Sequence, residues 1–152
     1  MSSQITDPFY FESEKFVFLG AENLYSLFDP CAFGLSPTAP HTGCQKGFVV
    51  EFRMEARQLY LGGLKVYCSD GRYPTIYGVD PVLDDMEMWR YNFHVKLNYS
   101  GNILIGRRLK PEYRGRAFTG PHSYDATFML TFSDGLLVKF EDTTGTNIAA
   151  YN

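Results

Sequence analysis

The sequence contains little cysteine, a single tryptophan and no long apolar run. Its three cysteines, Cys31, Cys44 and Cys68, are odd in number and irregularly spaced, which does not suit a disulfide framework. No apolar run approaches the roughly 20 residues that a membrane-spanning helix needs. Residues 1–4 have neither the basic start nor the apolar stretch of a secretory signal. We therefore expect reduced thiols, a cytoplasmic location and no association with a membrane.

Motifs for catalysis and for cofactor binding are absent as well. The chain has no Gly-x-Ser-x-Gly elbow, no Walker loop and no dinucleotide fingerprint. His94 alternates with Lys96 on the polar side of an expected strand, and His122 lies in a loop, and neither has an identifiable acid–base partner. Paired carboxylates for glycoside cleavage leave no sequence pattern, because their separation depends on the fold. We expect no cofactor, and an unrecognised enzyme remains only an alternative.

One loop offers soft metal ligands, namely Cys31, His41 and Cys44. Structural zinc sites use paired Cys and His ligands at short fixed spacings and need a fourth ligand. The spacing here matches none of those patterns, and no fourth ligand follows. We therefore interpret the three as unrelated loop residues and expect no metal.

The composition favours β structure. Thirteen Phe and eleven Tyr raise the aromatic fraction to 16%, within a hydrophobic fraction of 45%, and such residues suit half-buried pleated surfaces. A chain of 152 residues is of single-domain size and can bury a sizeable core, so one globular domain over residues 1–152 is expected. The net charge of -3 argues against coating nucleic acid through the overall field.

The clearest predicted hairpin joins residues 127–132 to residues 136–141, which both alternate apolar and polar residues. A two-residue turn would place Leu130 opposite Lys139, whereas a three-residue loop, with Gly135 at positive φ, avoids this mismatch. Phe132 would then face Leu136. The apolar side chains on one buried face would be Phe128, Leu130, Phe132, Leu136, Val138 and Phe140.

A second hairpin is predicted over residues 91–109 by the same reasoning, with a loop at 99–101. It places Leu97 opposite Ile103 and Val95 opposite Ile105, and it needs Gly101 at positive φ.

The N-terminal half predicts more hairpins and a long loop. Residues 9–11 and 16–19 would pair around a four-residue loop, a short helix would follow within 22–28, and strands at 48–54, 59–61 and 64–68 would form a meander. Gly62-Gly63 would be the meander's second turn, and Cys68 a core residue. Residues 29–46 show no periodicity, so they form either a functional lid or partner-binding loop, or a surface crossover.

Asp80-Pro81 resembles a helix start, with a helix running toward Trp89. In total, nine or ten strands and at most two short helices predict an all-β, mainly antiparallel fold. The sequence leaves a β-sandwich and a partly open barrel as alternatives.

Two oppositely charged segments are the candidate binding sites. The acidic one is expected to contribute to a partner-binding face, and it comprises Asp80, Asp84, Asp85 and Glu87. The basic one, with Tyr113 and Phe118 nearby, could bind an anion or unstacked bases, or simply face water, and it comprises Arg107, Arg108, Lys110, Arg114 and Arg116. Four clustered carboxylates need compensating positive charge, either from the basic segment or from a partner.

The absence of catalytic motifs, the acidic charge and the aromatic content together favour a protein-binding module. Small acidic proteins that neutralise a toxin, as bacterial immunity proteins do, provide one specific hypothesis by analogy. The alternative is a β domain that binds a small anionic ligand or nucleic acid through residues 107–116. The oligomeric state stays open.

Overall fold

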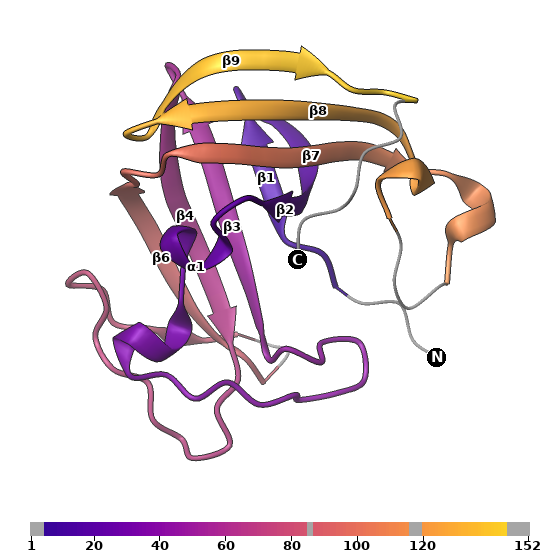
Figure 1. Cartoon of the computed structure of the whole chain (residues 1–152). Helices are drawn as coiled ribbons and strands as arrows, with labels where there is room; N and C mark the ends of the chain where they lie inside the picture. The colour runs from indigo at the N-terminus through magenta and orange to yellow at the C-terminus, as the bar shows by residue number, and fades with distance from the viewer. Residues whose placement is uncertain (1–4, 85–86, 116–119, 146–152) are drawn as a thin grey trace.

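The fold is one large, mostly antiparallel sheet that curls into a barrel (Figure 1). A computed structural model describes residues 5–84, 87–115 and 120–145 of the chain. Its strands are β1 (Pro8–Phe11), β2 (Glu14–Ala21), β3 (Phe48–Glu55), β4 (Gln58–Val66), β5 (Val82–Leu83), β6 (Trp89–Lys96), β7 (Gly101–Leu109), β8 (Tyr124–Ser133) and β9 (Leu136–Asp142). Its helices are α1 (Leu24–Leu27) and the 3-10 turns η1 (Pro30–Phe33), η2 (Pro111–Tyr113) and η3 (Pro121–Ser123).

The strand order β3-β1-β2-β7-β8-β9-β4 closes on itself because β3 also pairs with β4. β6 and β5 extend the sheet beyond β4. Only the β1–β3 pair is parallel among the ladders of the described chain. The shortest strand pairing in the ring is the one between β9 and β4, where the ladder consists of Gln58 opposite Leu136. The all-β prediction is confirmed, and of the two predicted alternatives the structure is the partly open barrel.

Phenylalanine fills the barrel where β9 diverges from β4. Four rings form a closed circuit with centroid distances from 5.2 to 6.2 Å: Phe11, Phe16, Phe128 and Phe140. Phe140 is 49% exposed at this opening, whereas Leu130 on the neighbouring strand is fully buried. Aromatic packing therefore replaces ladder hydrogen bonds at this part of the wall.

The predicted register of the β8–β9 hairpin is wrong. The turn has two residues, Asp134 and Gly135, at φ of 49° and 83°, and Phe132 lies opposite Leu137. Two left-handed residues match the twist of the flanking strands. The mismatch that argued against this turn is removed by a bulge. The register shifts between Thr131 and Phe132, so Leu130 lies opposite Phe140 and not Lys139. Gly135 does have positive φ, as predicted.

The predicted hairpin over residues 91–109 is also wrong. β6 pairs with β4 and β5, whereas β7 pairs with β2 and β8. The segment between them forms a corner, where the buried Tyr99 hydroxyl accepts from Asn23 N at 3.2 Å and donates to Asn102 O at 3.0 Å. Alternation specifies strands and faces, but it does not specify which strand lies alongside.

The N-terminal hairpin is confirmed, with a tighter turn than predicted. Glu12 and Ser13 have φ of 48° and 74°, so Phe9 lies opposite Phe16 instead of Phe18. The short helix within 22–28 is confirmed as α1.

Gly62-Gly63 is not a turn, because β4 runs through both glycines as one strand with register shifts against its two neighbours.

The helix predicted from Asp80 is wrong as well. Val82 and Leu83 form β5 and pair with Arg90 and Trp89. The Asp80 carboxylate accepts a hydrogen bond from the Thr75 hydroxyl, so it does not cap a helix.

All three cysteines are free thiols, and Cys68 is buried as predicted. None of the helices in the described ranges is long and apolar enough to cross a membrane.

Candidate binding face on the outer side of the sheet

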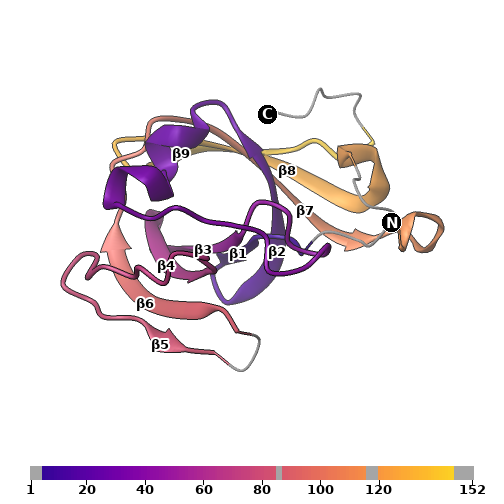
Figure 2. The same ribbon diagram turned by 90° about the horizontal axis from the view of Figure 1, so that it is seen from below.

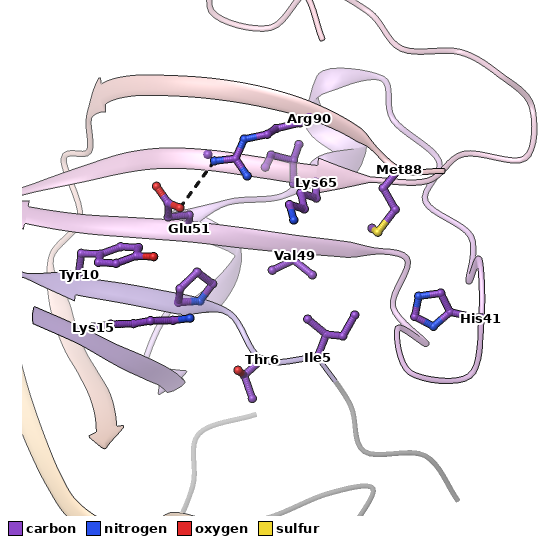
Figure 3. Close-up of a pocket in the computed structure, with 13 residues that line it drawn as sticks. Ile5, Thr6, Tyr10, Lys15, His41, Val49, Glu51, Lys65, Met88 and Arg90 are labelled. Atoms are coloured by element: carbon purple, nitrogen blue, oxygen red, sulfur yellow. Dashed lines mark ion pairs between the residues drawn. The ribbon is translucent and has the colours of Figure 1, made fainter. Parts of the chain in front are cut away.

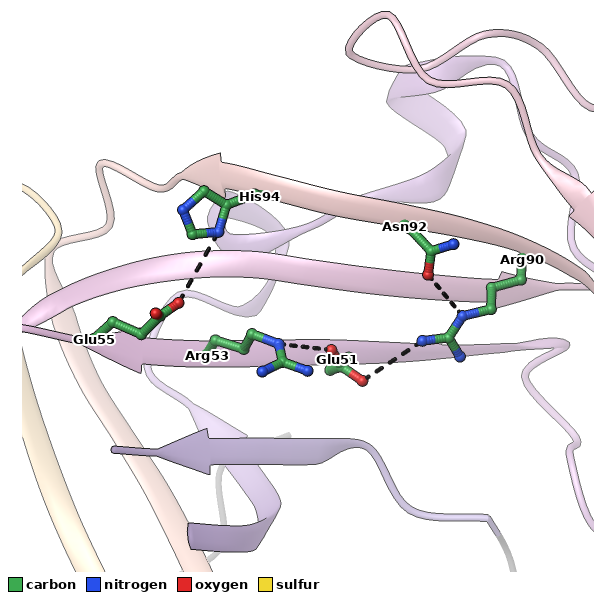
Figure 4. Close-up of polar contacts among 6 residues, drawn as sticks. All are labelled: Glu51, Arg53, Glu55, Arg90, Asn92 and His94. Carbon is green, nitrogen blue, oxygen red and sulfur yellow. Dashed lines mark hydrogen bonds and ion pairs between the residues drawn. The ribbon is translucent and has the colours of Figure 1, made fainter. Parts of the chain in front are cut away.

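The outward side chains of β3 form the centre of the candidate site. Along this strand Val50, Phe52 and Met54 are buried in the barrel, so the alternate residues face outward. Glu51 and Arg53 thereby lie on the same face as the outward residues of β6, across the intervening strand β4, as Figure 4 shows. We call the set on this face the polar ladder, and it comprises Glu51, Arg53, Glu55, Arg90, Asn92 and His94.

Glu51 connects the two arginines of the polar ladder. Arg53 Nε donates to Glu51 Oε2 at 2.9 Å, and Arg90 Nη2 lies 3.9 Å from Glu51 Oε1. Arg90 Nε also donates to Asn92 Oδ1 at 2.8 Å. The Glu51 side chain is only 14% exposed, so its charge is screened less by solvent than that of a typical surface carboxylate. Glu51 therefore orients the Arg53 guanidinium by a hydrogen bond, and the Arg90 guanidinium is oriented by Asn92 and by the longer ion pair with Glu51.

The two glycines of β4 make room for this arrangement. A Cβ on Gly62 would lie 2.9 Å from Glu51 Oε2 and 3.0 Å from Arg53 Cδ. A Cβ on Gly63 would lie 3.8 Å from Arg90 Nη2. A side chain at Gly62 would displace the Glu51 carboxylate and the Arg53 side chain from these positions. The glycine pair that the sequence suggested as a turn instead leaves space for them above β4.

Aromatic rings fix the ladder at both sides. The Arg53 guanidinium lies 4.7 Å above the Tyr10 ring, and the His94 ring stacks on Tyr60 at 4.4 Å. His94 Nδ1 is also 4.0 Å from Glu55 Oε1. Stacking and cation–π contacts each contribute about 0.5 to 1 kcal/mol at exposed sites, which favours a single conformation.

A cavity of about 380 Å³ lies beside the ladder (Figure 3). Its polar lining includes Tyr10, Lys15, Glu51, Lys65 and Arg90. Three of these side chains are cationic and one is a carboxylate, which leaves a positive surplus in a protein whose net charge is -3. The cavity is therefore suited to an anionic group.

The described part of the acidic segment is connected to this cavity only through the ion pair of Asp84 with Lys65, which lines it. Asp84 pairs with Lys65, with Oδ2 and Nζ 3.3 Å apart, and even this pairing leaves a surplus of cations around the cavity. Asp80 is bound by Thr75, and Glu87 has φ of 67°. Asp85 lies outside the described residues. Lys65 is thus one positive partner of Asp84, and the partner-binding role of the acidic segment stays a prediction.

Among the residues that the structure describes, the acidic and basic segments are not brought together. The basic one begins with Arg107 and Arg108 at the end of β7 and continues past it, and Figure 2 shows this end of β7 away from β5. Arg107 pairs with Glu14 at 3.1 Å and lies 5.4 Å above the Phe16 ring, while Arg108 is 4.0 Å from Asp125.

Of the remaining basic residues, Lys110 precedes η2 and Arg114 follows it. Arg116 lies outside the described residues. The anion-binding role of this segment stays a prediction.

The remaining histidine and cysteine candidates each have local contacts of their own. The His122 ring packs edge-on against Tyr113 at 5.4 Å. His41 Nδ1 accepts from Gly43 N at 3.1 Å, and Cys44 is buried while Cys31 is exposed. Within the described parts of the chain, no group of three or more His, Cys, Asp or Glu side chains could hold a metal ion.

Sequence reasoning missed the polar ladder. Its signal was present in the strict alternation of Glu51 and Arg53 with Val50 and Phe52, but charges on a solvated strand face are common. Comparisons with protein-family models, curated proteins and solved structures gave no match to this chain.

Proposed function

We propose that this protein is a non-catalytic binding module that docks a protein partner on the polar ladder. The observation that carries the proposal is the pair of arginines, Arg53 and Arg90, oriented by Glu51 and Asn92 above the two glycines of β4. Arginine and tyrosine dominate the energetic centres of protein interfaces. A preorganised side chain loses less conformational entropy when it binds, so more of its contact energy appears as affinity.

The shape of the face supports a protein partner over a small molecule. The ladder runs along β3 and across to β6, so its arginines, histidine and stacked aromatic rings spread over an open sheet surface. Small-molecule sites instead converge on an enclosed, mostly apolar cavity.

The charge of the face indicates the partner's chemistry. Lys15, Lys65 and Arg90 around the neighbouring cavity favour an acidic patch or segment on the partner. A toxin-neutralising role and a cytoplasmic location are specific versions of this proposal, and both stay predictions.

The test begins with capture of a partner by the tagged wild-type chain, followed by binding kinetics with the purified partner. Arg53→Ala should weaken binding by at least about 1 to 2 kcal/mol, because it removes a fixed central arginine. Lys15→Glu should slow association mainly at low salt, because it reverses a charge at the edge of the face.

Arg108→Glu is the matched control, because this arginine is 68% exposed and belongs to the basic segment. Binding that survives both ladder-face changes but is lost in Arg108→Glu would reject the proposal and support the anion-binding alternative. Wild-type and variant chains should show equal thermal stability within a few degrees before their affinities are compared.

A further inference from the structure

A second cavity, of about 420 Å³, lies at one end of the barrel. Its walls are apolar and come from β2, β3, α1 and the loop after α1, including Phe18, Leu24, Phe28, Phe48 and Phe52. The segment between β2 and β3 crosses this end of the barrel (Figure 2). Mouths of β-barrels and large apolar cavities with a few polar groups are common places for small ligands.

This cavity and the polar ladder use opposite faces of the same strand. Phe48, Val50 and Phe52 of β3 line the barrel-end cavity, whereas Val49 and Glu51 line the cavity beside the ladder. Side chains alternate between faces along a strand, so a ligand in one cavity leaves the other accessible. The barrel-end cavity is therefore a separate site.

The charged groups around the barrel-end cavity already have partners. Lys46 Nζ pairs with Asp7, whose other carboxylate oxygen accepts from Val50 N at 2.9 Å. The Lys46 ammonium also lies 4.7 Å from the centre of the Phe48 ring. The Asp29 carboxylate accepts from Cys31 N at 3.1 Å. A charged ligand would compete with these contacts for Lys46, Asp7 or Asp29, whereas a neutral one would leave them unchanged.

We infer that the barrel-end cavity binds a small uncharged aromatic or alicyclic molecule. An apolar cavity of about 150 Å³ is enough for benzene, so this one has room for about two to three rings. Five aromatic side chains in its wall provide faces and edges for stacking: Phe18, Tyr25, Phe28, Phe48 and Phe52.

Cys31 provides a built-in reporter of occupancy, because it lines the cavity and is exposed. Cys44 and Cys68 are buried, and burial raises the pKa of both thiols, which lowers their thiolate fraction. Iodoacetamide should therefore modify Cys31 first. A ligand in the cavity should slow that modification without any change in the sequence.

The binding test uses two fluorescent probes that differ by one charge, N-phenyl-1-naphthylamine and its sulfonated analogue 8-anilino-1-naphthalenesulfonate. The neutral probe should bind at least about tenfold more tightly than the anionic one, a difference of about 1.4 kcal/mol. Saturating neutral probe should also slow alkylation of Cys31 severalfold in the wild-type chain.

Variants locate the binding. Leu24→Trp fills the cavity from α1 and should weaken binding of the neutral probe about tenfold or more. Leu83→Trp adds the same ring on β5, where Leu83 is 62% exposed, and should leave the affinity unchanged. Phe140→Lys changes the exposed ring beside Phe11 and Phe128, away from the barrel-end cavity. It should also leave the affinity for the neutral probe unchanged.

Three results would overturn the inference: no binding of the neutral probe, unslowed alkylation of Cys31 at saturation, or loss of binding in Phe140→Lys but not in Leu24→Trp. The alkylation measurement needs no variant, so it decides the question even if Leu24→Trp fails to fold.

Discussion

Both the backbone conformation and the surroundings of Gly135 require glycine at this position. It has φ of 83°, and a Cβ there would lie 1.9 Å from the backbone oxygen of Leu97. Gly71 has a similar φ of 72° but no atom within 4 Å of such a Cβ. The two positions share the cost of a left-handed residue, about 1 to 2 kcal/mol, and differ only in the clash.

We therefore predict that Gly135→Ala destabilises the protein much more than Gly71→Ala. The second change should cost about 1 kcal/mol, and the first at least about 3 kcal/mol, because the clashing atom is backbone and cannot move aside. Urea unfolding of both variants measures the difference. Equal losses in the two variants would mean that the turn between β8 and β9 is not packed against residue 97.

The burial of Tyr91 makes the stability of the folded state depend on pH at alkaline values. Its hydroxyl donates to Pro74 O at 2.6 Å, and burial, with smaller contributions from Cys68, Tyr73 and Asp80, raises its pKa to about 12. The unfolded value is about 10, so the folded state holds this proton more tightly. The resulting stability is fully present below about pH 10 and is lost as the pH rises toward 12.

Tyr91→Phe should be less stable than wild type by about 1 kcal/mol at pH 7, because the hydrogen bond to Pro74 is lost. The difference should shrink above about pH 10, where wild type loses stability that the variant never had. Unfolding free energies at several pH values measure this. A gap that stays constant up to about pH 11.5 would mean that Tyr91 is not the group that titrates.

At the scale of elements, strands were more predictable from sequence than their partners. Most strands occur near the predicted ranges because the two-residue period of a half-buried strand is strong. The bulge that shifts Phe140 opposite Leu130 has no comparable sequence signal, since it arises from twist and packing between β8 and β9. The same holds for Gly62-Gly63, whose role depends on Glu51 and Arg53 of the adjacent strand.

Two substitutions in β9 distinguish the observed register of this strand from the register predicted from sequence. The structure buries Leu137 at 9% exposure, whereas Val138 is 57% exposed. Leu137→Lys should cost at least about 3 kcal/mol, because it places an ammonium against the core, and Val138→Lys should change stability by no more than about 0.5 kcal/mol. Thermal unfolding of the pair measures both. The register predicted from sequence requires the opposite order.

At the scale of the whole molecule, the barrel depends on a short contact between β9 and β4. Leu59 N donates to Gly135 O and Leu137 N donates to Arg57 O, both at 2.8 Å. The Arg57 guanidinium also donates to Leu137 O, with its Nη2 at 2.6 Å. One side chain thus reinforces a seam that has few backbone hydrogen bonds.

Arg57→Lys keeps the charge but removes the guanidinium fork, so the seam should open more often. We expect the amides of Leu59 and Leu137 to exchange with solvent about tenfold faster, while amides between β7 and β8 are unchanged. Hydrogen exchange followed by NMR measures this, with Arg108→Lys as the surface control. Uniform acceleration across the sheet would indicate global destabilisation instead.

The order of strands around the ring also determines when the chain can fold. β2, at residues 14–21, finds its second neighbour only in β7, at residues 101–109, and the ring closes only with β9. Pairings this distant in sequence require large loops to close before the paired strands gain their contacts, which slows folding to the millisecond-to-second range. During synthesis the outer edge of β2 therefore stays unpaired until most of the chain has left the ribosome.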